Sequence, residues 1–207
     1  MFRQMCEIVP PGQTDGVLVQ HVVVTEKDHE LSLLRSIFAR EPPVEPGVYV
    51  QLHVGGQLMM SDTQMEKTSN YEIVRQARGD VLIAGLGIGL ILVPILANPE
   101  VTSVTVVEKY EGVIELVGSS LKELSGSEKL KIVHADILEW NPPKGQKWDV
   151  LYFDIWPNIC EDNLDEMATL HRRFGRRKKP GGWMDSWQRS RLKRDRATAR
   201  RHRGMWY

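Results

Sequence analysis

The chain has little of what several classes of protein require. Two cysteines, Cys6 and Cys160, are too few for a disulfide scaffold, and the N-terminus lacks the basic-then-apolar pattern of a signal peptide. The longest apolar run, from Val81 to Ala97, is interrupted by three glycines and a proline and falls short of the ~20 residues that span a bilayer. The histidines show no metal-ligand spacing. We therefore expect a cytoplasmic protein with reduced thiols, no metal and no membrane segment.

Composition and charge describe a globular chain with a basic end. The 207 residues, 42% of them hydrophobic and 26% charged, are enough for one substantial core. Their formal net charge is zero, but residues 171–203 contain fourteen Lys or Arg against two Asp. Such a segment attracts polyanions, so nucleic acid is one expected partner. The alternative, of comparable weight, is that the segment contacts the acidic body of the protein or of another subunit.

Residues 1–79 are expected to form a small region of β-hairpin and helix. Three β-rich runs, the last two arranged as a hairpin around Gly55-Gly56, are predicted at residues 16–25, 48–54 and 57–60. Two helices are predicted at residues 28–40 and 64–78. A capping box of Thr63 and Glu66 is expected to start the second helix.

Residues 80–187 alternate between short apolar strands and helices. Strands are expected at residues 81–84, 104–107, 131–134 and 150–153, and a fifth at 183–187 follows a turn at 179–182. Helices are expected between them at residues 89–97, 110–124, 137–140 and 163–173, with Pro94 making the first start late or bend. The alternation predicts an α/β fold with a doubly wound, mostly parallel sheet that lacks a further strand pair. Residues 188–207 are expected to form a basic C-terminal helix or tail.

A glycine-rich turn, Gly85-Leu-Gly-Ile-Gly89, lies between the first of these strands and its helix. Glycines let the backbone pass close to a ligand and expose helix N-terminal amides to it. The alternative is a turn that serves only tight packing of the strand against the helix. The dinucleotide fingerprint requires Gly or Ala where Leu90 stands, which counts against a nicotinamide cofactor.

Acidic residues follow the next three strands, at the edge where doubly wound sheets bind ligands. Glu108 is expected to accept hydrogen bonds from ribose hydroxyls, unless it is an ordinary polar strand end. Asp136, with Ile137 beside it, suits the amino group and ring of adenine, or else caps a helix. For Asp154, the roles of catalytic acid, substrate anchor and structural cap are all open.

Taken in order, these segments resemble the class I S-adenosylmethionine-dependent methyltransferases, which have a Rossmann-like fold, over about residues 80–187. The resemblance rests on Val81-Leu-Ile-Ala-Gly-Leu-Gly-Ile-Gly89, Glu108, Ala135-Asp136 and Trp148-Asp-Val-Leu-Tyr-Phe-Asp154. It implies that S-adenosylmethionine is the cofactor. It also implies roles beside the methionine part for Gly85, Gly87 and Gly89, at the ribose for Glu108, at the adenine for Asp136 and Ile137, and at the transfer site for Asp154.

The layout is closest to the polyamine aminopropyltransferases, which also have an N-terminal β-hairpin region and a helix before the glycine strand. Tyr71-Glu72 partly matches their Tyr-His-Glu, which makes Tyr71 a candidate substrate residue. However, Ile88 stands where their glycine turn has an Asp, and Asp154-Ile-Trp-Pro157 lacks the second acid of their Asp-x-x-Asp-Pro. Trp156 and Pro157 are further candidates, since an acid beside an aromatic ring can hold a planar amine or base. Trp156 is otherwise a core or lid residue.

The sequence therefore predicts an enzyme that transfers a methyl group from S-adenosylmethionine to an unidentified acceptor, with Asp154 orienting the nucleophile. Two alternatives stay open. One is aminopropyl transfer from decarboxylated S-adenosylmethionine, and the other is a non-catalytic nucleoside- or nucleic-acid-binding module of the same fold. A homodimer is also expected, as one way of covering the exposed edge of the fifth strand.

Overall fold

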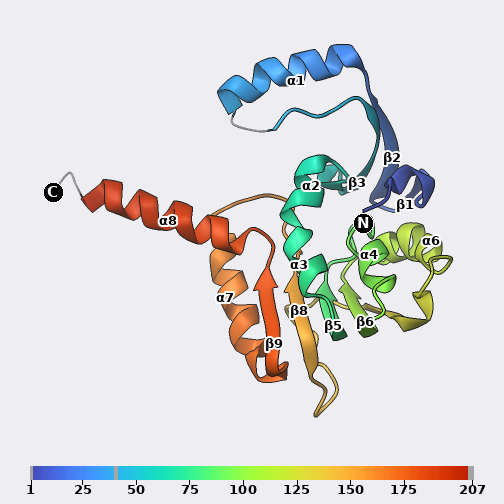
Figure 1. Ribbon diagram of the computed structural model, residues 1–207, viewed down its shortest axis with the longest axis vertical. Helices are drawn as coiled ribbons and strands as arrows, with labels where there is room; N and C mark the ends of the chain where they lie inside the picture. Colours follow the sequence, from blue (N-terminus) through green and yellow to red (C-terminus); the bar gives the residue numbers. More distant parts are fainter. Residues whose placement is uncertain (1, 40–41, 205–207) are drawn as a thin grey trace.

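The computed structural model describes residues 2–39 and 42–204 and arranges them in two sheets joined by helices (Figure 1). The N-terminal sheet is antiparallel, in the order β1 (Gly12–Thr14), β2 (Val17–Val24), β3 (Gly47–Val54) and β4 (Gln57–Ser61). The predicted hairpin is confirmed between β3 and β4. Gly55 and Gly56 both have positive φ, 57° and 80°, which a two-residue hairpin turn requires.

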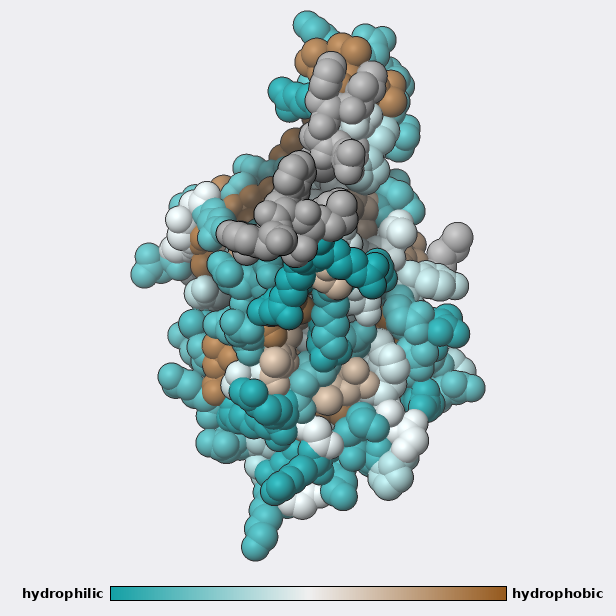
Figure 2. Space-filling model, turned by 90° about the vertical axis from the view of Figure 1, so that its left-hand side faces the viewer, coloured by the Kyte–Doolittle hydropathy of each residue, from teal (hydrophilic) through white to brown (hydrophobic). Residues whose placement is uncertain are grey.

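Helix α1 (Glu26–Ala39) stands apart from the body, at the far end of β2 and β3 (Figure 1). A short 3-10 helix, Met5–Glu7, precedes β1. The helix predicted at 28–40 is confirmed as α1, except that Arg40 lies outside the described residues. Leu31, Leu33 and Leu34 of α1 are exposed, and Figure 2 shows apolar side chains gathered at this tip of the molecule.

The second sheet is entirely parallel and has the order β7-β6-β5-β8-β9. Its strands are β5 (Gly79–Ala84), β6 (Val101–Glu108), β7 (Leu130–His134), β8 (Trp148–Phe153) and β9 (Lys178–Ser186). The chain begins in the middle of the sheet, moves outward to β7 and then crosses to β8 and β9. This confirms the predicted doubly wound α/β fold, and within residues 2–39 and 42–204 the sheet has these five strands.

Alternate side chains of the central strands enter two separate apolar clusters, because successive residues of a strand point to opposite faces. Val81 and Ile83 of β5 pack on the face covered by α4 (Leu92–Leu96) and the N-terminal sheet. Leu82 and Ala84 pack on the other face, against α7 (Asn163–Phe174). Each fully buried aliphatic side chain of this kind contributes about 2 kcal/mol to stability. The near-continuous apolar strands of the sequence thus reflect burial on both faces.

The helices between the strands follow the predicted order, with local differences. Helix α4 starts late, so that Pro94 falls within its first turn, where a missing N–H costs no intrahelical bond. The helix predicted at 110–124 runs as α5 (Glu111–Val113), a π-helical stretch (Ile114–Gly118) and α6 (Ser119–Leu121). A 3-10 helix, Ser127–Lys129, leads into β7. The helix predicted at 137–140 is wrong: these residues form a turn.

The single helix predicted at 64–78 is also wrong. Two short helices, α2 (Gln64–Ser69) and α3 (Tyr71–Gln76), are separated at Asn70, which has the non-helical angles φ −99° and ψ 5°. The expected capping box does not form, since the Thr63 side chain makes no cap hydrogen bond. Glu66, its expected partner, is buried instead. The residue types correctly predicted that a helix starts here, but tertiary packing buries the Glu66 side chain instead of leaving it at the helix N-terminus.

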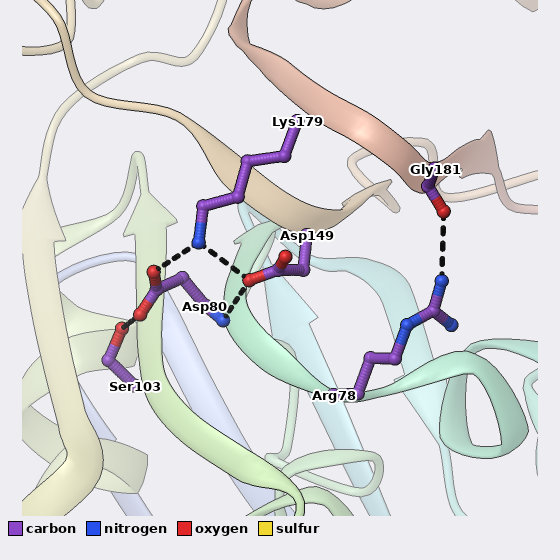
Figure 3. A network of polar contacts seen from close by, with 6 residues as sticks. All are labelled: Arg78, Asp80, Ser103, Asp149, Lys179 and Gly181. Atoms are coloured by element: carbon purple, nitrogen blue, oxygen red, sulfur yellow. Dashed lines mark hydrogen bonds and ion pairs between the residues drawn. The ribbon is translucent and has the colours of Figure 1, made fainter.

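A polar network holds together the amino ends of the central strands (Figure 3). The Lys179 ammonium contacts Asp80 of β5 at 2.7 Å and Asp149 of β8 at 2.8 Å, and Ser103 of β6 donates to Asp80 at 2.7 Å. Arg78 donates to the carbonyl of Gly181 at 3.0 Å (Figure 3). The segment predicted as a turn, 179–182, is therefore part of β9, which has a register shift opposite the start of β8, and Lys179 reaches β8 and, beyond it, β5.

The C-terminal part of the chain is helical, as predicted. After α7, a 3-10 turn (Gly175–Arg177) leads into β9, and α8 (Arg189–Gly204) then projects from the body (Figure 1). Leu192 anchors α8 in the core beneath α7. Cys6 and Cys160 are both free, and no described helix has the length and apolar character needed to cross a bilayer.

Candidate functional site

A cavity of about 320 Å³ lies at the carboxyl ends of β5, β6, β7 and β8, which is a usual size for a small-molecule site. The order of the strands turns around at β5, and doubly wound sheets bind ligands at this switch point. The sequence-predicted residues that line the cavity are Gly85, Gly87, Glu108, Asp136, Ile137, Asp154, Trp156 and Pro157.

The glycine turn needs glycine at two cavity positions. Gly85 has φ +94°, and a Cβ there would lie 2.0 Å from the carbonyl oxygen of Asp154. Gly87 has φ +52°, and a Cβ there would meet the sulfur of Met60 on β4 at 2.4 Å. Gly89 does not line the cavity, and its missing Cβ instead makes room for Leu121. The missing Cβ atoms of Gly85 and Gly87 thus let the turn pack closely against Asp154 and Met60 in the cavity wall, while that of Gly89 serves helix packing.

Glu108 is held rigidly at the end of β6. Its Oε2 accepts the backbone N–H of Leu86 at 2.7 Å, and its Oε1 accepts that of Tyr110 at 2.8 Å. Burial raises the pKa of Glu108, and these two backbone donors limit the rise. Each carboxylate oxygen has two lone pairs, so both keep accepting capacity toward the cavity.

Asp136 lies at the end of β7 and contacts a cation. Its Oδ1 accepts the backbone N–H of Leu138 at 2.9 Å, and its Oδ2 lies 3.0 Å from the Lys109 ammonium. Partial burial works toward a higher pKa of Asp136, but the Leu138 donor and Lys109 together hold it below its ordinary value. The cap-like bond to Leu138 therefore forms, although no helix follows it.

Asp154 and Glu66 bring two carboxyl groups to the same cavity. Asp154 follows β8 and donates its backbone N–H to the carbonyl of Ala84 at 2.9 Å, which fixes the two strand ends together. Burial raises the pKa of Asp154 well above its usual range, and the nearby Glu66 raises it further. Burial also raises the pKa of Glu66 to about 7. Two such carboxyls in one cavity are suited to proton transfer or to binding a cation.

Trp156 and Pro157 form part of the cavity wall. The Trp156 indole N–H donates to Oε2 of Glu166 on α7 at 2.8 Å, so the polar edge of the ring has its partner within the protein. The ring is largely buried and packs in the apolar cluster on the α7 face. Trp156 is thus a core residue, one of the roles expected of it, and it also forms part of the cavity wall.

One predicted substrate residue lies elsewhere. Tyr71, at the start of α3, is 61% exposed and does not line the cavity. The helix break at Asn70 separates Tyr71 from α2, whose Glu66 does reach the cavity. The partial match of Tyr71-Glu72 to an aminopropyltransferase motif is therefore not accompanied by a place in this site.

Sequence reasoning missed the N-terminal wall of the cavity. Leu52, Met59 and Met60 of the N-terminal sheet line the cavity, as does Glu66. The only sequence signal was the burial implied by apolar Met59 and Met60 at the end of a hairpin. For Glu66, the pattern indicated a different role.

Similarity to known proteins is found among solved structures. No protein-family model matches the chain, and no curated protein does. The chain is similar to the CcbJ methyltransferase from Streptomyces caelestis, with 20% identity, a TM-score of 0.47, and coverage of 57% of this chain and 47% of that one. It is similar also to a SAM-dependent methyltransferase from Geobacter sulfurreducens in complex with S-adenosyl-L-homocysteine, with 18% identity, a TM-score of 0.45, and coverage of 59% and 47%. The chain thus spans about half the length of these structures.

Proposed function

We propose that the cavity binds S-adenosylmethionine and that the protein transfers its methyl group to an acceptor. The observation that carries this proposal is the position of Glu108. Its buried carboxylate, fixed by two backbone N–H groups, lines the same cavity as Gly85 and Gly87 of the glycine turn. S-adenosylmethionine supplies a methyl group on a positively charged sulfur, which needs little covalent help from the protein.

The residues have separate roles in this proposal. Glu108 accepts hydrogen bonds from the ribose hydroxyls, because its oxygens keep free lone pairs. Asp136 accepts from the adenine amino group, and the apolar Ile137 packs against the ring. The backbone of Gly85 and Gly87 lies beside the methionine part. Asp154 faces the acceptor and orients its nucleophilic atom, so that transfer is favoured by positioning.

Titration calorimetry tests the proposal directly. S-adenosylmethionine and S-adenosylhomocysteine are expected to bind in the micromolar range, and Glu108→Gln to weaken both by about tenfold or more, because one of its oxygens becomes a donor. Glu111→Gln, at an exposed neighbouring position, is the matched control and should leave affinity unchanged.

Other outcomes of this titration favour the alternatives. A clear preference for decarboxylated S-adenosylmethionine supports aminopropyl transfer. If both carboxylated compounds bind but no methyl transfer to any acceptor occurs, the non-catalytic module is supported. Absence of binding to all three compounds contradicts the proposal.

A second proposed activity is polyanion binding by α8, and a specific arrangement favours it. Four exposed cations of α8 have no carboxylate partner within residues 2–39 and 42–204, namely Lys193, Arg194, Arg200 and Arg201. Figure 2 views the molecule from the side toward which α8 projects, and the surface around it is mostly hydrophilic. Nucleic acid is the polyanion that we propose.

Fluorescence anisotropy with a labelled DNA duplex tests this second activity. The double variant Arg200→Glu/Arg201→Glu should weaken binding and reduce the slope of log affinity against log salt by about 0.9 for each phosphate that α8 no longer neutralises. Arg35→Glu, which changes an exposed cation on α1, is the control. Equal slopes for all three proteins would show that α8 does not bind DNA.

We also propose a homodimer, because β9 is an edge strand of the parallel sheet as described. Pairing of β9 with its copy would cover that edge. Light scattering is expected to give about twice the chain mass of 23.7 kDa, and a mass of one chain contradicts this proposal.

A further inference from the structure

A second cavity, of about 580 Å³, adjoins the first. The residues that line both cavities are Met59, Met60, Glu66, Pro157 and Trp187. On its far side the second cavity is bounded by α8, through Arg191, Leu192 and Asp195. A molecule that enters along α8 therefore reaches the residues around Glu66 before it reaches the glycine turn and Glu108.

Glu66 at this junction, and Asp154 near it in the first cavity, have carboxyl groups that no described residue pairs with. Glu66 is only 8% exposed, and within the described residues its carboxyl oxygens accept no hydrogen bond and form no ion pair. No fully buried side-chain oxygen or nitrogen in that part of the chain lacks a partner. The Glu66 oxygens must therefore reach the cavity, which the residue lines. The Asp154 carboxyl is likewise without a partner in the described residues.

The other carboxyl groups around the two cavities have a partner within the protein, either a cation or an N–H donor, and Glu108 has its two backbone donors. Glu161 lies 3.2 Å from Arg196, and Asp195 lies 3.8 Å from Arg191. Glu166 accepts the Trp156 indole N–H at 2.8 Å. Asp136 is paired with Lys109, as described above. Glu66 and Asp154 are thus the lining carboxyl groups whose oxygens have no partner among the described residues, and burial favours their neutral form unless a cation binds.

We infer that the junction is the acceptor subsite and that it takes a primary aliphatic amine as its ammonium ion, held between Glu66 and Asp154. This inference rests on the proposed function, because it names the class of acceptor for the same cavity. An ammonium group has three N–H donors. It therefore matches two carboxylates that accept no hydrogen bond from the described part of the protein. The apolar part of the amine lies against Met59, Met60 and Met65.

The same pair can prepare the amine as a nucleophile. An ammonium nitrogen has no lone pair, so one N–H proton must leave it. The Glu66 carboxylate takes this proton and becomes the neutral acid, and the nitrogen becomes the neutral amine. Since burial raises the pKa of Glu66 to about 7, this carboxyl is a far better proton acceptor than an exposed glutamate.

Calorimetry with 1-hexylamine tests the inference on the full chain saturated with S-adenosylhomocysteine. 1-Hexanol is the neutral probe of the same length. The amine is expected to bind at least about tenfold more tightly than the alcohol, and Glu66→Gln or Asp154→Asn to remove that preference. Glu161→Gln is the matched control, because Glu161 lines the second cavity but is paired with Arg196. It should change amine affinity by less than about twofold.

The affinity for S-adenosylhomocysteine separates the possible failures. If that compound binds while amine and alcohol bind equally, or while Glu66→Gln retains the preference for the amine, the inference is overturned and the proposed function stands. If S-adenosylhomocysteine does not bind, the proposed function fails. In that case, wild type and Glu66→Gln are titrated with the amine and the alcohol in the absence of S-adenosylhomocysteine. These titrations still decide whether the junction is an ammonium site. Retained S-adenosylhomocysteine affinity in Glu66→Gln shows that the variant is folded.

Discussion

The Tyr152 hydroxyl of β8 donates a hydrogen bond to Oδ1 of Asn70 at 2.9 Å, and both residues are buried. Asn70 lies at the break between α2 and α3, and its own amide donates to the carbonyl of Glu66 at 3.2 Å. This chain of bonds connects the central sheet to the backbone of the residue that brings a carboxyl to the cavity. We regard it as the contact that positions α2.

Tyr152→Phe is expected to lower the free energy of unfolding by about 1–2 kcal/mol, because it leaves the buried Asn70 oxygen without its donor. Urea denaturation measures the change. Tyr49→Phe is the matched control, since the Tyr49 hydroxyl donates to an exposed carbonyl, that of Glu45, and its loss should cost only a few tenths of a kcal/mol. Equal losses of unfolding free energy in the two variants would show that the buried Tyr152 hydrogen bond stabilises the fold no more than the exposed Tyr49 one.

Gly85→Ala is expected to damage both folding and cofactor binding. Its Cβ would meet the Asp154 carbonyl oxygen at 2.0 Å, and its φ of +94° is unfavourable for alanine. The backbone strain alone costs about 1–2 kcal/mol, and the contact adds to it. Gly145→Ala separates the two effects, because Gly145 also has positive φ, +83°, but has no atom within 4 Å of the added Cβ.

The expected order of stability in thermal melts is wild type, Gly145→Ala and then Gly85→Ala. Only Gly85→Ala should weaken S-adenosylhomocysteine binding in calorimetry. If both alanine variants lose the same stability and keep ligand affinity, glycine is needed at position 85 only for its positive φ and not for the close contact with Asp154.

The Lys179 network makes stability depend on pH. The Lys179 ammonium is the largest cause that holds the pKa of Asp80 and of Asp149 below the usual 3.8. A carboxylate with a depressed pKa stabilises the folded state above its unfolded pKa and loses that contribution as pH falls through the folded value. Lys179→Met should therefore cost about 1 kcal/mol at pH 7, for these partly exposed groups, and less at about pH 3.

Chemical denaturation at the two pH values measures this difference. Lys144→Met removes an exposed lysine outside the network and should have little effect at either pH. A loss for Lys179→Met that is independent of pH would mean that the lysine stabilises the sheet through its packing and not through its charge.

The strand ends of the candidate site were predictable because they depend on local pattern and one topological rule. Glu108, Asp136 and Asp154 each follow a β-rich run, and parallel strands bring their carboxyl ends to one edge. Once the alternation of strands and helices is recognised, these acids are placed together without knowledge of any side-chain contact. The same reasoning predicted the order of the elements.

Glu66 and Lys179 could not be placed in this way, because long-range contacts decide their roles. The bond from Tyr152 to Asn70 spans 82 positions in sequence, and it fixes where α2 ends. Pro180-Gly181-Gly182 has the residue types of a turn, yet the pairing of β9 with β8 draws this segment into the sheet with a register shift. Local propensity was overridden by tertiary packing in both places.

Glu66→Gln is expected to stabilise the protein, and the gain should depend on pH. The folded protein keeps the Glu66 proton up to about pH 7, whereas the unfolded chain loses it near 4.5, so the stability of the wild type falls between these values as pH rises. The pKa difference corresponds to about 3 kcal/mol, which glutamine avoids because it does not ionise.

Urea denaturation at pH 4 and pH 8 should show a gain in stability for Glu66→Gln only at the higher pH, and the exposed Glu161→Gln should show no gain at either pH. A gain of equal size at both pH values would mean that Glu66 is not a strained ionisable group. If Glu66→Gln gains stability only at the higher pH and also loses amine binding, the protein keeps the Glu66 carboxyl at the cavity although this carboxyl lowers its stability. Such a cost in stability is common at functional sites.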